Sequence, residues 1–285
     1  MTKYELPFSI DLNGRTAVVT GAGGVLCSQF ARALAACGAR VALLDLNLDA
    51  AGAVAAEINA GGGQAKAYKT NVLDKEILEG VHQQILADFG PCDLLINGAG
   101  GNHPRATTSQ EYYDPDHVPA DTVTFFDLDK QGISFVFELN FLGTLLPTQV
   151  FAREMANRPN AAIINISSMN AFTPLTKIPA YSGAKAAISN LTQWLAVHFA
   201  KTGIRVNAIA PGFFATAQNQ KLLFTDDGKL TDRSLKILGQ TPMGRFGDSK
   251  ELIGALLFLA SPEAAGFITG IVLPVDGGFS AYSGV

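Results

Sequence analysis

A glycine-rich turn near the start of the chain constrains the fold more than any other feature. Residues 15–20 are a short run rich in β-forming residues that ends at Gly21, and a helical pattern follows through residue 36. Residues 40–44 are a second apolar run, which Asp45 closes. Strand, glycine turn, helix and strand in this order predict a parallel βαβ unit with the turn at the carboxyl edge of the sheet.

The same alternation continues along the chain. We expect further strands at 64–69, 93–96, 161–166, 205–209 and 270–274, and helices at 49–60, 74–90, 135–157, 181–201 and 248–260. This alternation predicts a single-domain α/β protein over residues 1–285, a Rossmann-type doubly wound parallel sheet with helices on both faces. Two segments interrupt the pattern: a polar, proline-bearing insert at 101–132 and a segment at 213–240.

Charge and composition exclude several classes of protein. The net charge of −4 provides no basic surface for nucleic acid, and no run of about 18 apolar residues or secretory leader is present. We therefore expect a soluble cytoplasmic protein without nucleic-acid or membrane partners. The cysteines, Cys27, Cys37 and Cys92, lack ligand spacing, so we expect reduced thiols and no metal site.

A tyrosine and a lysine form the clearest candidate for chemistry. Tyr181 and Lys185 are four residues apart in a predicted helix, which places both side chains on one face. An ammonium beside a phenol favours the phenolate, so we expect a lowered Tyr181 pKa, suited to proton transfer to or from a carbonyl or alcohol oxygen. Ser168 could hold the same oxygen. Alone, the pair is weak evidence, because a tyrosine and a lysine at this spacing usually lie on a solvated helix face.

Together with the turn at Gly21, the segment 97–100, Asn140 and the pair at 211–212, these residues resemble the short-chain dehydrogenase/reductase family over nearly the whole chain. The resemblance implies hydride transfer between a nicotinamide and a substrate carbon, with Tyr181 moving the proton, Lys185 lowering its pKa and Ser168 aligning the oxygen. Ser168 lies at the family spacing before Tyr181, whereas Ser167 lies one residue further away. Asn140 would hold a water that reaches Lys185, or would only bond backbone in a helix bend.

The cofactor expected from this resemblance is NAD. Asp45 follows Gly21 by 24 residues, where a carboxylate accepts hydrogen bonds from the adenosine ribose and repels a 2′-phosphate. Leu46 offers no compensating cation. Val25 and Cys27 occupy two positions where the family has glycine, and Gly98 replaces a family asparagine.

The remaining cofactor contacts follow from the family's pattern. Val72 would pack on adenine, Asn71 would cap its amino group, and Thr216 would reach the carboxamide or phosphate. The full set of expected contacts is Gly21, Gly23, Gly24, Val25, Leu26, Asp45, Leu46, Asn71, Val72, Asn97, Gly98, Ala99, Tyr181, Lys185, Pro211, Gly212, Phe214 and Thr216.

Longer local matches at 97–104 and 174–179 resemble the D-mannonate oxidoreductase (fructuronate reductase) branch of the family. A hydroxy or keto sugar acid is therefore the expected substrate, and 213–240 would form a lid over it. The expected substrate contacts are Asn102, His103, Arg105, Ser168, Asn170, Lys177 and Tyr181, with Lys177 favoured as the carboxylate partner.

Other readings of the same pattern remain open. The chain could be another NAD-linked polyol or sugar-acid dehydrogenase resembling gluconate 5-dehydrogenase, a 3-oxoacyl thioester reductase, or an NAD(H)-sensing regulator without turnover. The intact set of catalytic residues argues against the regulator. The resemblance also implies a homotetramer or homodimer.

Overall fold

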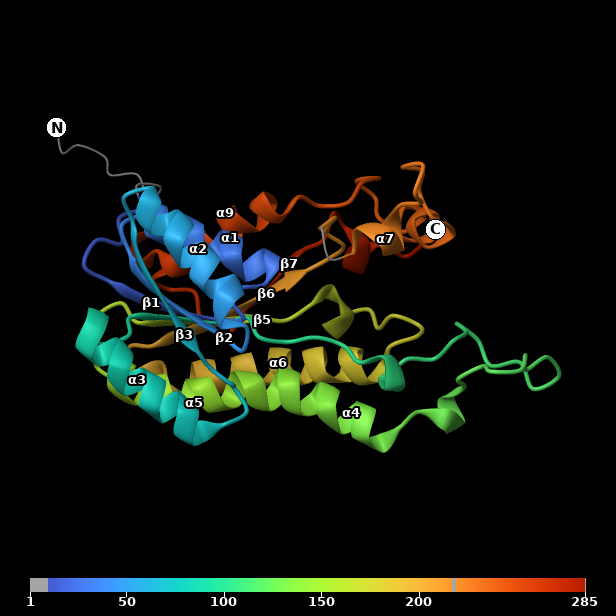
Figure 1. Cartoon of the computed structure of the whole chain (residues 1–285), viewed down its shortest axis with the longest axis horizontal. Coiled ribbons are helices and arrows are strands. Elements are labelled where there is room, and N and C mark those ends of the chain that lie inside the picture. Colours follow the sequence, from blue (N-terminus) through green and yellow to red (C-terminus); the bar gives the residue numbers. More distant parts are fainter. Residues whose placement is uncertain (1–9, 217–218, 285) are drawn as a thin grey trace.

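The computed structural model describes residues 10–216 and 219–284, and within them it contains one seven-stranded parallel sheet. The strand order is β3-β2-β1-β4-β5-β6-β7 (Figure 1). The strands are β1 Thr16–Thr20, β2 Arg40–Asp45, β3 Gln64–Lys69, β4 Leu94–Asn97, β5 Ala162–Ile166, β6 Arg205–Pro211 and β7 Val272–Val275. This confirms the predicted fold class. The order reverses direction between β1 and β4, which is where sheets of this kind bind ligands.

Helices cover both faces of the sheet. Helices α1, α2 and α9 lie on one face, and α3, α5 and α6 lie on the other (Figure 1). Each face buries its own apolar cluster, as expected for parallel strands that are covered on both sides. The helices are α1 Val25–Ala36, α2 Leu48–Ala60, α3 Lys75–Phe89, α4 Lys130–Phe137, α5 Gly143–Met155, α6 Pro179–His198, α7 Gln220–Leu223, α8 Asp232–Gly239, α9 Ile253–Ala260 and α10 Pro262–Ala265.

The single helix expected at 135–157 is interrupted, so that expectation was wrong in detail. The helix begins earlier, because the Asp129 carboxylate accepts hydrogen bonds from the amides of Gln131 and Gly132. A π-helical turn at Glu138–Leu142 then separates α4 from α5. A π turn inserts an extra residue into the helix, and such turns are frequent at functional sites. Asn140 lies within this turn, fully buried.

The continuous helical stretch Lys130–Met155 is long and apolar enough to span a membrane, and its most apolar window of 18 residues has a mean hydropathy of 1.3. Half of this 18-residue window is buried inside the protein. Helix α3 packs against α5, and α6 packs against α4, so the apolar surface has partners within the fold. We interpret this stretch as a core helix.

The insert at 101–132 and the segment at 213–240 lie beyond the carboxyl ends of the strands. The insert contains two 3-10 turns, Pro104–Ala106 and Phe125–Asp127, and projects from the body of the molecule (Figure 1). The other segment carries the short helices α7 and α8 on the opposite side of that edge. Both therefore border the carboxyl edge of the sheet.

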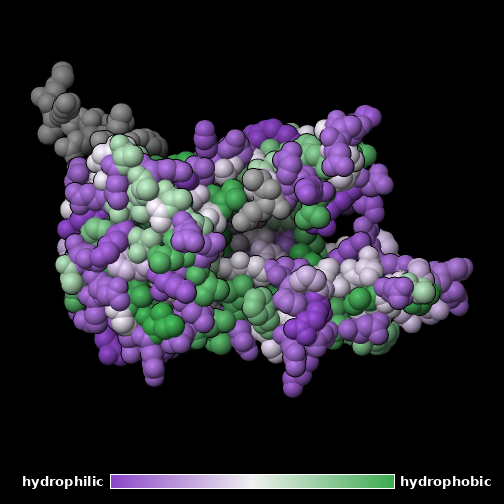
Figure 2. All heavy atoms as spheres, viewed as in Figure 1, coloured by the Kyte–Doolittle hydropathy of each residue, from purple (hydrophilic) through white to green (hydrophobic). Residues whose placement is uncertain are grey.

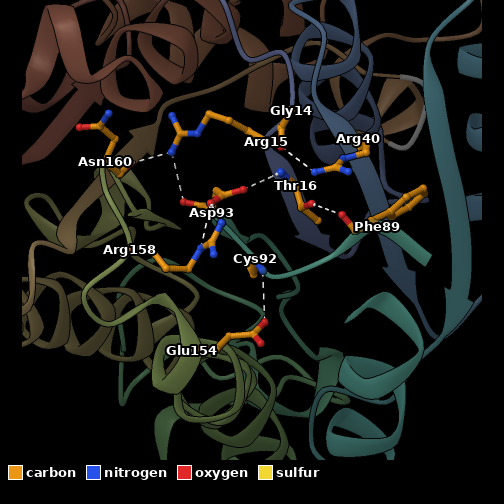
Figure 3. Close-up of polar contacts among 10 residues, drawn as sticks. All are labelled: Gly14, Arg15, Thr16, Arg40, Phe89, Cys92, Asp93, Glu154, Arg158 and Asn160. Carbon is orange, nitrogen blue, oxygen red and sulfur yellow. Dashed lines mark hydrogen bonds and ion pairs between the residues drawn. The ribbon is translucent and has the colours of Figure 1, made fainter. Parts of the chain in front are cut away.

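The opposite, amino edge of the sheet is held by a polar network around Asp93 (Figure 3). The Asp93 carboxylate accepts hydrogen bonds from the Thr16 amide at 2.9 Å and from Arg158 Nε at 3.0 Å. Arg15 donates to the carbonyl of Asn160 at 2.6 Å. The network ties β1, β4 and the loop before β5 together and leaves the carboxyl edge for ligands.

Candidate active site

A groove crosses the carboxyl ends of β1, β2 and β4, where the strand order reverses, and encloses about 490 Å³. It provides the shape and position that a dinucleotide requires. The expected cofactor residues that line it are Gly21, Gly23, Gly24, Val25, Leu26, Asp45, Leu46, Asn71, Val72, Gly98 and Ala99.

The glycine turn approaches the end of β4 so closely that side chains are excluded. Gly21 has a φ of +66°, and a Cβ there would lie 3.0 Å from the Ala99 backbone. A Cβ at Gly23 would lie 2.8 Å from the Ala50 side chain. Helix α1 begins directly after this turn without a side-chain cap or an acidic residue in its first turn. Its free amides suit a pyrophosphate.

Cys27 and Gly98, which both differ from the family pattern, compensate each other sterically. A Cβ at Gly98 would overlap the Cys27 Sγ and would lie 3.0 Å from the Thr20 carbonyl oxygen. The thiol therefore fills the space that a side chain at 98 would need. Burial raises the pKa of Cys27 to about 12, so the thiol remains neutral and packs as a small apolar group.

Asp45 lies in the groove, as expected, and also holds the glycine turn by hydrogen bonding. It ends β2 inside the groove, and its Oδ2 accepts a hydrogen bond from the Gly23 amide at 2.8 Å. Its Oδ1 accepts one from the Asn47 amide at 2.8 Å. A carboxylate has about four acceptor positions, so capacity for ribose hydroxyls remains. The groove, the uncapped α1 terminus and this carboxylate together fit an adenine dinucleotide.

The two remaining residues of the adenine end lie where expected. Val72 is buried in the groove wall, and Asn71 is exposed beside it. The Asn71 Oδ1 already accepts a hydrogen bond from the Leu73 amide at 3.1 Å. A carboxamide oxygen has a second acceptor position, so the expected contact with an adenine amino group stays a prediction.

Two expected cofactor residues point elsewhere. The Asn97 carboxamide is buried and donates to Asn165 Oδ1 and Thr148 Oγ1, both at 2.9 Å, so it joins β4 to β5 and α5 and does not line the groove. The Phe214 ring is buried, and a Cβ at Gly247 would lie 2.5 Å from it. Its role is therefore core packing.

The other residues that follow β6 lie near its carboxyl end. Pro211 is the last residue of β6, and the Gly212 amide donates to the Val275 carbonyl at 3.0 Å. The Thr216 amide donates to Asn219 Oδ1 at 2.8 Å. These three lie outside the lined groove.

The candidate catalytic side chains meet where β5 ends and α6 begins. Ser168 is the second residue after β5, and its Oγ accepts a hydrogen bond from the Asn170 amide at 3.2 Å. Tyr181 lies in the first turn of α6, near Ser168, and the Lys185 Nζ is 5.5 Å from its ring centroid. Ser167 instead bonds the Lys185 carbonyl and Ser189, which anchors α6. The structure thus brings Ser168, not Ser167, to Tyr181.

The expected lowering of the Tyr181 pKa was wrong for the protein alone. Burial raises the pKa of Tyr181 to about 12, although the Ser168 hydrogen bond opposes this shift. Burial also lowers the pKa of Lys185 to about 8. The Lys185 Nζ donates to the Ile166 carbonyl at 2.8 Å. Desolvation is therefore the largest cause of both pKa shifts, in opposite directions because it disfavours the charged form of each group.

Asn140 links the π turn to the segment that follows β4. Its Nδ2 donates to the carbonyls of Gly101 at 2.7 Å and Val136 at 2.8 Å, and its Oδ1 accepts from the Gly101 amide. A Cβ at Gly100 would lie 2.6 Å from the Asn140 Oδ1 and 3.2 Å from the Lys185 Nζ. The helix-bend contact is present, and the residue also lies beside Lys185.

The expected substrate residues are only partly brought together. Asn102 donates a hydrogen bond to Thr107, and His103 accepts one from the Arg105 amide. The Arg105 guanidinium forms an ion pair with Asp129 at 2.9 Å. The side chains of these three expected substrate residues therefore all have partners within the insert. Asn170 is buried, and its Oδ1 has no hydrogen-bond partner in the described part of the chain.

Lys177 lines a second pocket with residues that sequence reasoning missed. This pocket encloses about 440 Å³ between the insert, the loop before α6 and α8. Among its lining residues are Glu111, Arg233 and Lys236. Helical spacing on α8 could have shown that Arg233 and Lys236 share a face, but not which pocket they border.

A dinucleotide groove beside a serine, tyrosine and lysine on an α/β sheet defines a dehydrogenase-like site. Comparison with known proteins agrees, because the family model for short chain dehydrogenase matches residues 15–226. The chain belongs to the short-chain dehydrogenase family.

Three relatives cover almost the whole chain. A crystal structure of a candidate D-mannonate oxidoreductase from Haemophilus influenzae, with bound NAD, is 65% identical with a TM-score of 0.94, covering 96% of this chain and 98% of that one. The uncharacterized oxidoreductase UxuB of Bacillus subtilis is 53% identical over 98% of this chain and 100% of its own. Gluconate 5-dehydrogenase of Gluconobacter oxydans is 34% identical over 96% and 98%.

Proposed function

We propose that this protein is an NAD-linked oxidoreductase that interconverts a secondary alcohol and a ketone on a sugar acid, with D-mannonate and D-fructuronate as the substrate pair. The observation that carries the proposal is the placement of Tyr181 and Ser168 together at the sheet edge, with Lys185 beside the tyrosine ring. The similarity to the NAD-bound Haemophilus structure supports the cofactor and the substrate.

NAD rather than NADP is favoured by the end of β2. The Asp45 carboxylate lies in the groove with Leu46 next to it, and Leu46 is 67% exposed. A carboxylate there accepts hydrogen bonds from ribose hydroxyls and repels a 2′-phosphate. The remaining groove contacts would come from the glycine turn, the first turn of α1 and Val72.

When bound, the nicotinamide supplies the carbon that accepts or gives the hydride, and the residues of this chain handle the proton. In the alcohol-to-ketone direction, Tyr181 Oη takes the hydroxyl proton as the C–H bond gives up its hydride, and in the reverse direction it returns that proton. Ser168 Oγ holds the reacting oxygen. Lys185 lies beside the tyrosine ring, and Asn140 holds the segment at Gly100 and Gly101 next to Lys185.

The raised Tyr181 pKa gives this scheme a direction of pH dependence. A phenol with a pKa of about 12 is protonated near neutral pH, which suits donation to a ketone. Alcohol oxidation requires the phenolate, so its rate rises with pH. A positively charged Lys185 stabilises the Tyr181 phenolate. Because the pKa of Lys185 is about 8, Lys185 loses its charge at higher pH and then stabilises the phenolate less.

Tyr181→Phe tests the assignment, because it removes one oxygen and preserves the ring. We expect at least a hundredfold loss of kcat with D-mannonate or D-fructuronate, since positioned general acid–base groups contribute about 10²–10⁴-fold. NADH binding, followed by nicotinamide fluorescence, should be unchanged. Ser167→Ala is the matched control, because Ser167 contacts α6 rather than Tyr181. Turnover in Tyr181→Phe within threefold of wild type would contradict the proposal.

A panel of hexonates, hexuronates, gluconate and neutral polyols separates the alternatives. Gluconate turnover above that of D-mannonate would favour a gluconate 5-dehydrogenase-like activity, and NADH binding without turnover would favour a regulator. We also propose a cytoplasmic homotetramer or homodimer. Exposed aromatic side chains on α4 and α6, Phe135 and Trp194 among them, offer surface for such assembly, and gel filtration would measure it.

A further inference from the structure

The pocket around Lys177 is built by three segments that are distant in sequence. The insert provides Glu111, the loop before α6 provides Lys177, and α8 provides Arg233 and Lys236. Figure 2 shows the molecule hollowed on this side, between the segment with α7 and the projecting insert. The aromatic rings of Phe213 and Phe279 also line the pocket, with centroids 5.3 Å apart.

This pocket lies next to the candidate catalytic residues. Its wall at 173–178 runs directly into α6, which begins at Pro179 and carries Tyr181 in its first turn. Phe279 belongs to a 3-10 turn that contacts the turn after Ser168. A substrate whose reacting carbon lies at Tyr181 can therefore extend its far end into this pocket.

The charges that line the pocket do not cancel. Lys236 is paired with Glu111 at 2.8 Å, and this contact lowers the pKa of the Glu111 carboxyl, chiefly through the hydrogen bond from Lys236. Asp232 also lines the pocket, in the first turn of α8. In the described part of the chain, the side chains of Lys177 and Arg233 have no ion pair or hydrogen bond. Three cations against two carboxylates leave one positive charge.

We propose that Arg233, acting from α8 opposite Lys177, binds the substrate carboxylate and so selects sugar acids over neutral polyols. The inference rests on the proposed function and adds the residue that determines its specificity. A single excess positive charge balances a monoanionic carboxylate but leaves a phosphate dianion with one uncompensated negative charge. The guanidinium also offers paired donors that match a carboxylate. The Glu111–Lys236 ion pair ties α8 to the insert and sets the position of Arg233.

Arg233→Gln tests this role in steady-state kinetics. Arg233 is exposed in the free protein, and loss of its charge-assisted hydrogen bond to the substrate should raise the KM for D-mannonate about tenfold with little change in kcat. The KM of wild type should increase with salt, and that increase should be smaller in Arg233→Gln. Arg233→Lys should recover part of the loss. The matched control is Lys221→Gln, which removes a positive charge from α7, outside the pocket lining.

These assays distinguish a failure of the Arg233 proposal from a failure of the proposed oxidoreductase function. A KM for D-mannonate in Arg233→Gln within twofold of wild type, or an equal loss in Lys221→Gln, would overturn the role of Arg233 and leave the proposed function standing. Wild-type turnover of D-mannitol without turnover of any hexonate or hexuronate would overturn both the substrate class and this subsite. Unchanged NADH binding and Tm in Arg233→Gln exclude a folding defect as the cause of a raised KM.

Discussion

The contact between Cys27 and Gly98 predicts a strong dependence between two positions that are 71 residues apart. In Gly98→Ala, the new methyl group would overlap the Cys27 Sγ and would also lie 3.0 Å from the Thr20 carbonyl oxygen. Overpacking of this kind costs about 1–3 kcal/mol in folding free energy. Both positions belong to the groove wall, so we also expect weaker NADH binding.

Removal of the thiol should relieve most of this cost. With alanine at 27, the nearest atom of that side chain is the Cβ, which lies 3.7 Å from the added methyl, an ordinary contact. The clash with the Thr20 carbonyl remains. We therefore expect Gly98→Ala to cost about 1–2 kcal/mol less in a Cys27→Ala background than in wild type, the size of a direct coupling between neighbours.

Thermal unfolding of the four proteins at one concentration measures this coupling. A cost of about 1 kcal/mol should lower Tm by roughly 2–4 °C in a chain of this size class. Fluorescence titration with NADH gives the parallel effect on the groove. Strictly additive Tm changes, or a Gly98→Ala variant as stable as wild type, would refute the packing argument. Ala99→Gly is a suitable control, because it changes the same loop without adding atoms.

Two further perturbations follow from the same site. Asp45→Asn removes the charge that repels the 2′-phosphate of NADP, so the ratio of kcat/KM for NAD to that for NADP should fall at least tenfold. An unchanged ratio would show that Asp45 does not select the cofactor. Lys185 has a folded pKa of about 8 against an ordinary 10.5, so the unfolded chain binds more protons between these values. This group therefore penalises folding below about pH 8, and the penalty is lost as pH rises to about 10.5. The stability of wild type relative to Lys185→Met should increase over that window, and a flat difference in urea unfolding from pH 7.5 to 10 would show that Lys185 is not desolvated.

Much of the fold could be predicted because its signals are local. The glycine turn at Gly21 and the apolar runs lie within short windows, and the structure places strands and helices on them. Helix α2 is nevertheless capped by Asn47, two residues before the expected helix start at 49. The interruption of α4 and α5 could not be predicted in this way. It accompanies contacts between Asn140 and Gly101, which are 39 residues apart.

In the candidate site, too, the features set by local sequence could be predicted and those set by long-range contacts could not. Motifs gave the positions of Ser168, Tyr181 and Lys185, since their spacing is local to β5 and α6. The pKa of Tyr181 was missed because desolvation depends on everything packed around the ring. Arg233 was missed because its pocket exists only once α8 lies against the insert, through Lys236 and Glu111, 125 residues apart in sequence.

The segment after β4 connects the two halves of the site. On one side, the amides of Gly98 and Ala99 donate to Thr20 Oγ1 at 3.0 and 3.2 Å, next to the glycine turn. On the other side, Gly100 and Gly101 contact Asn140, and Gly100 also approaches the Lys185 Nζ. Glycine at three of these four positions lets the groove and Lys185 lie this close. Glycine at 98, where the family has asparagine, thus keeps the wall between the groove and Lys185 thin, and the Cys27 thiol fills the space that a side chain at 98 would need.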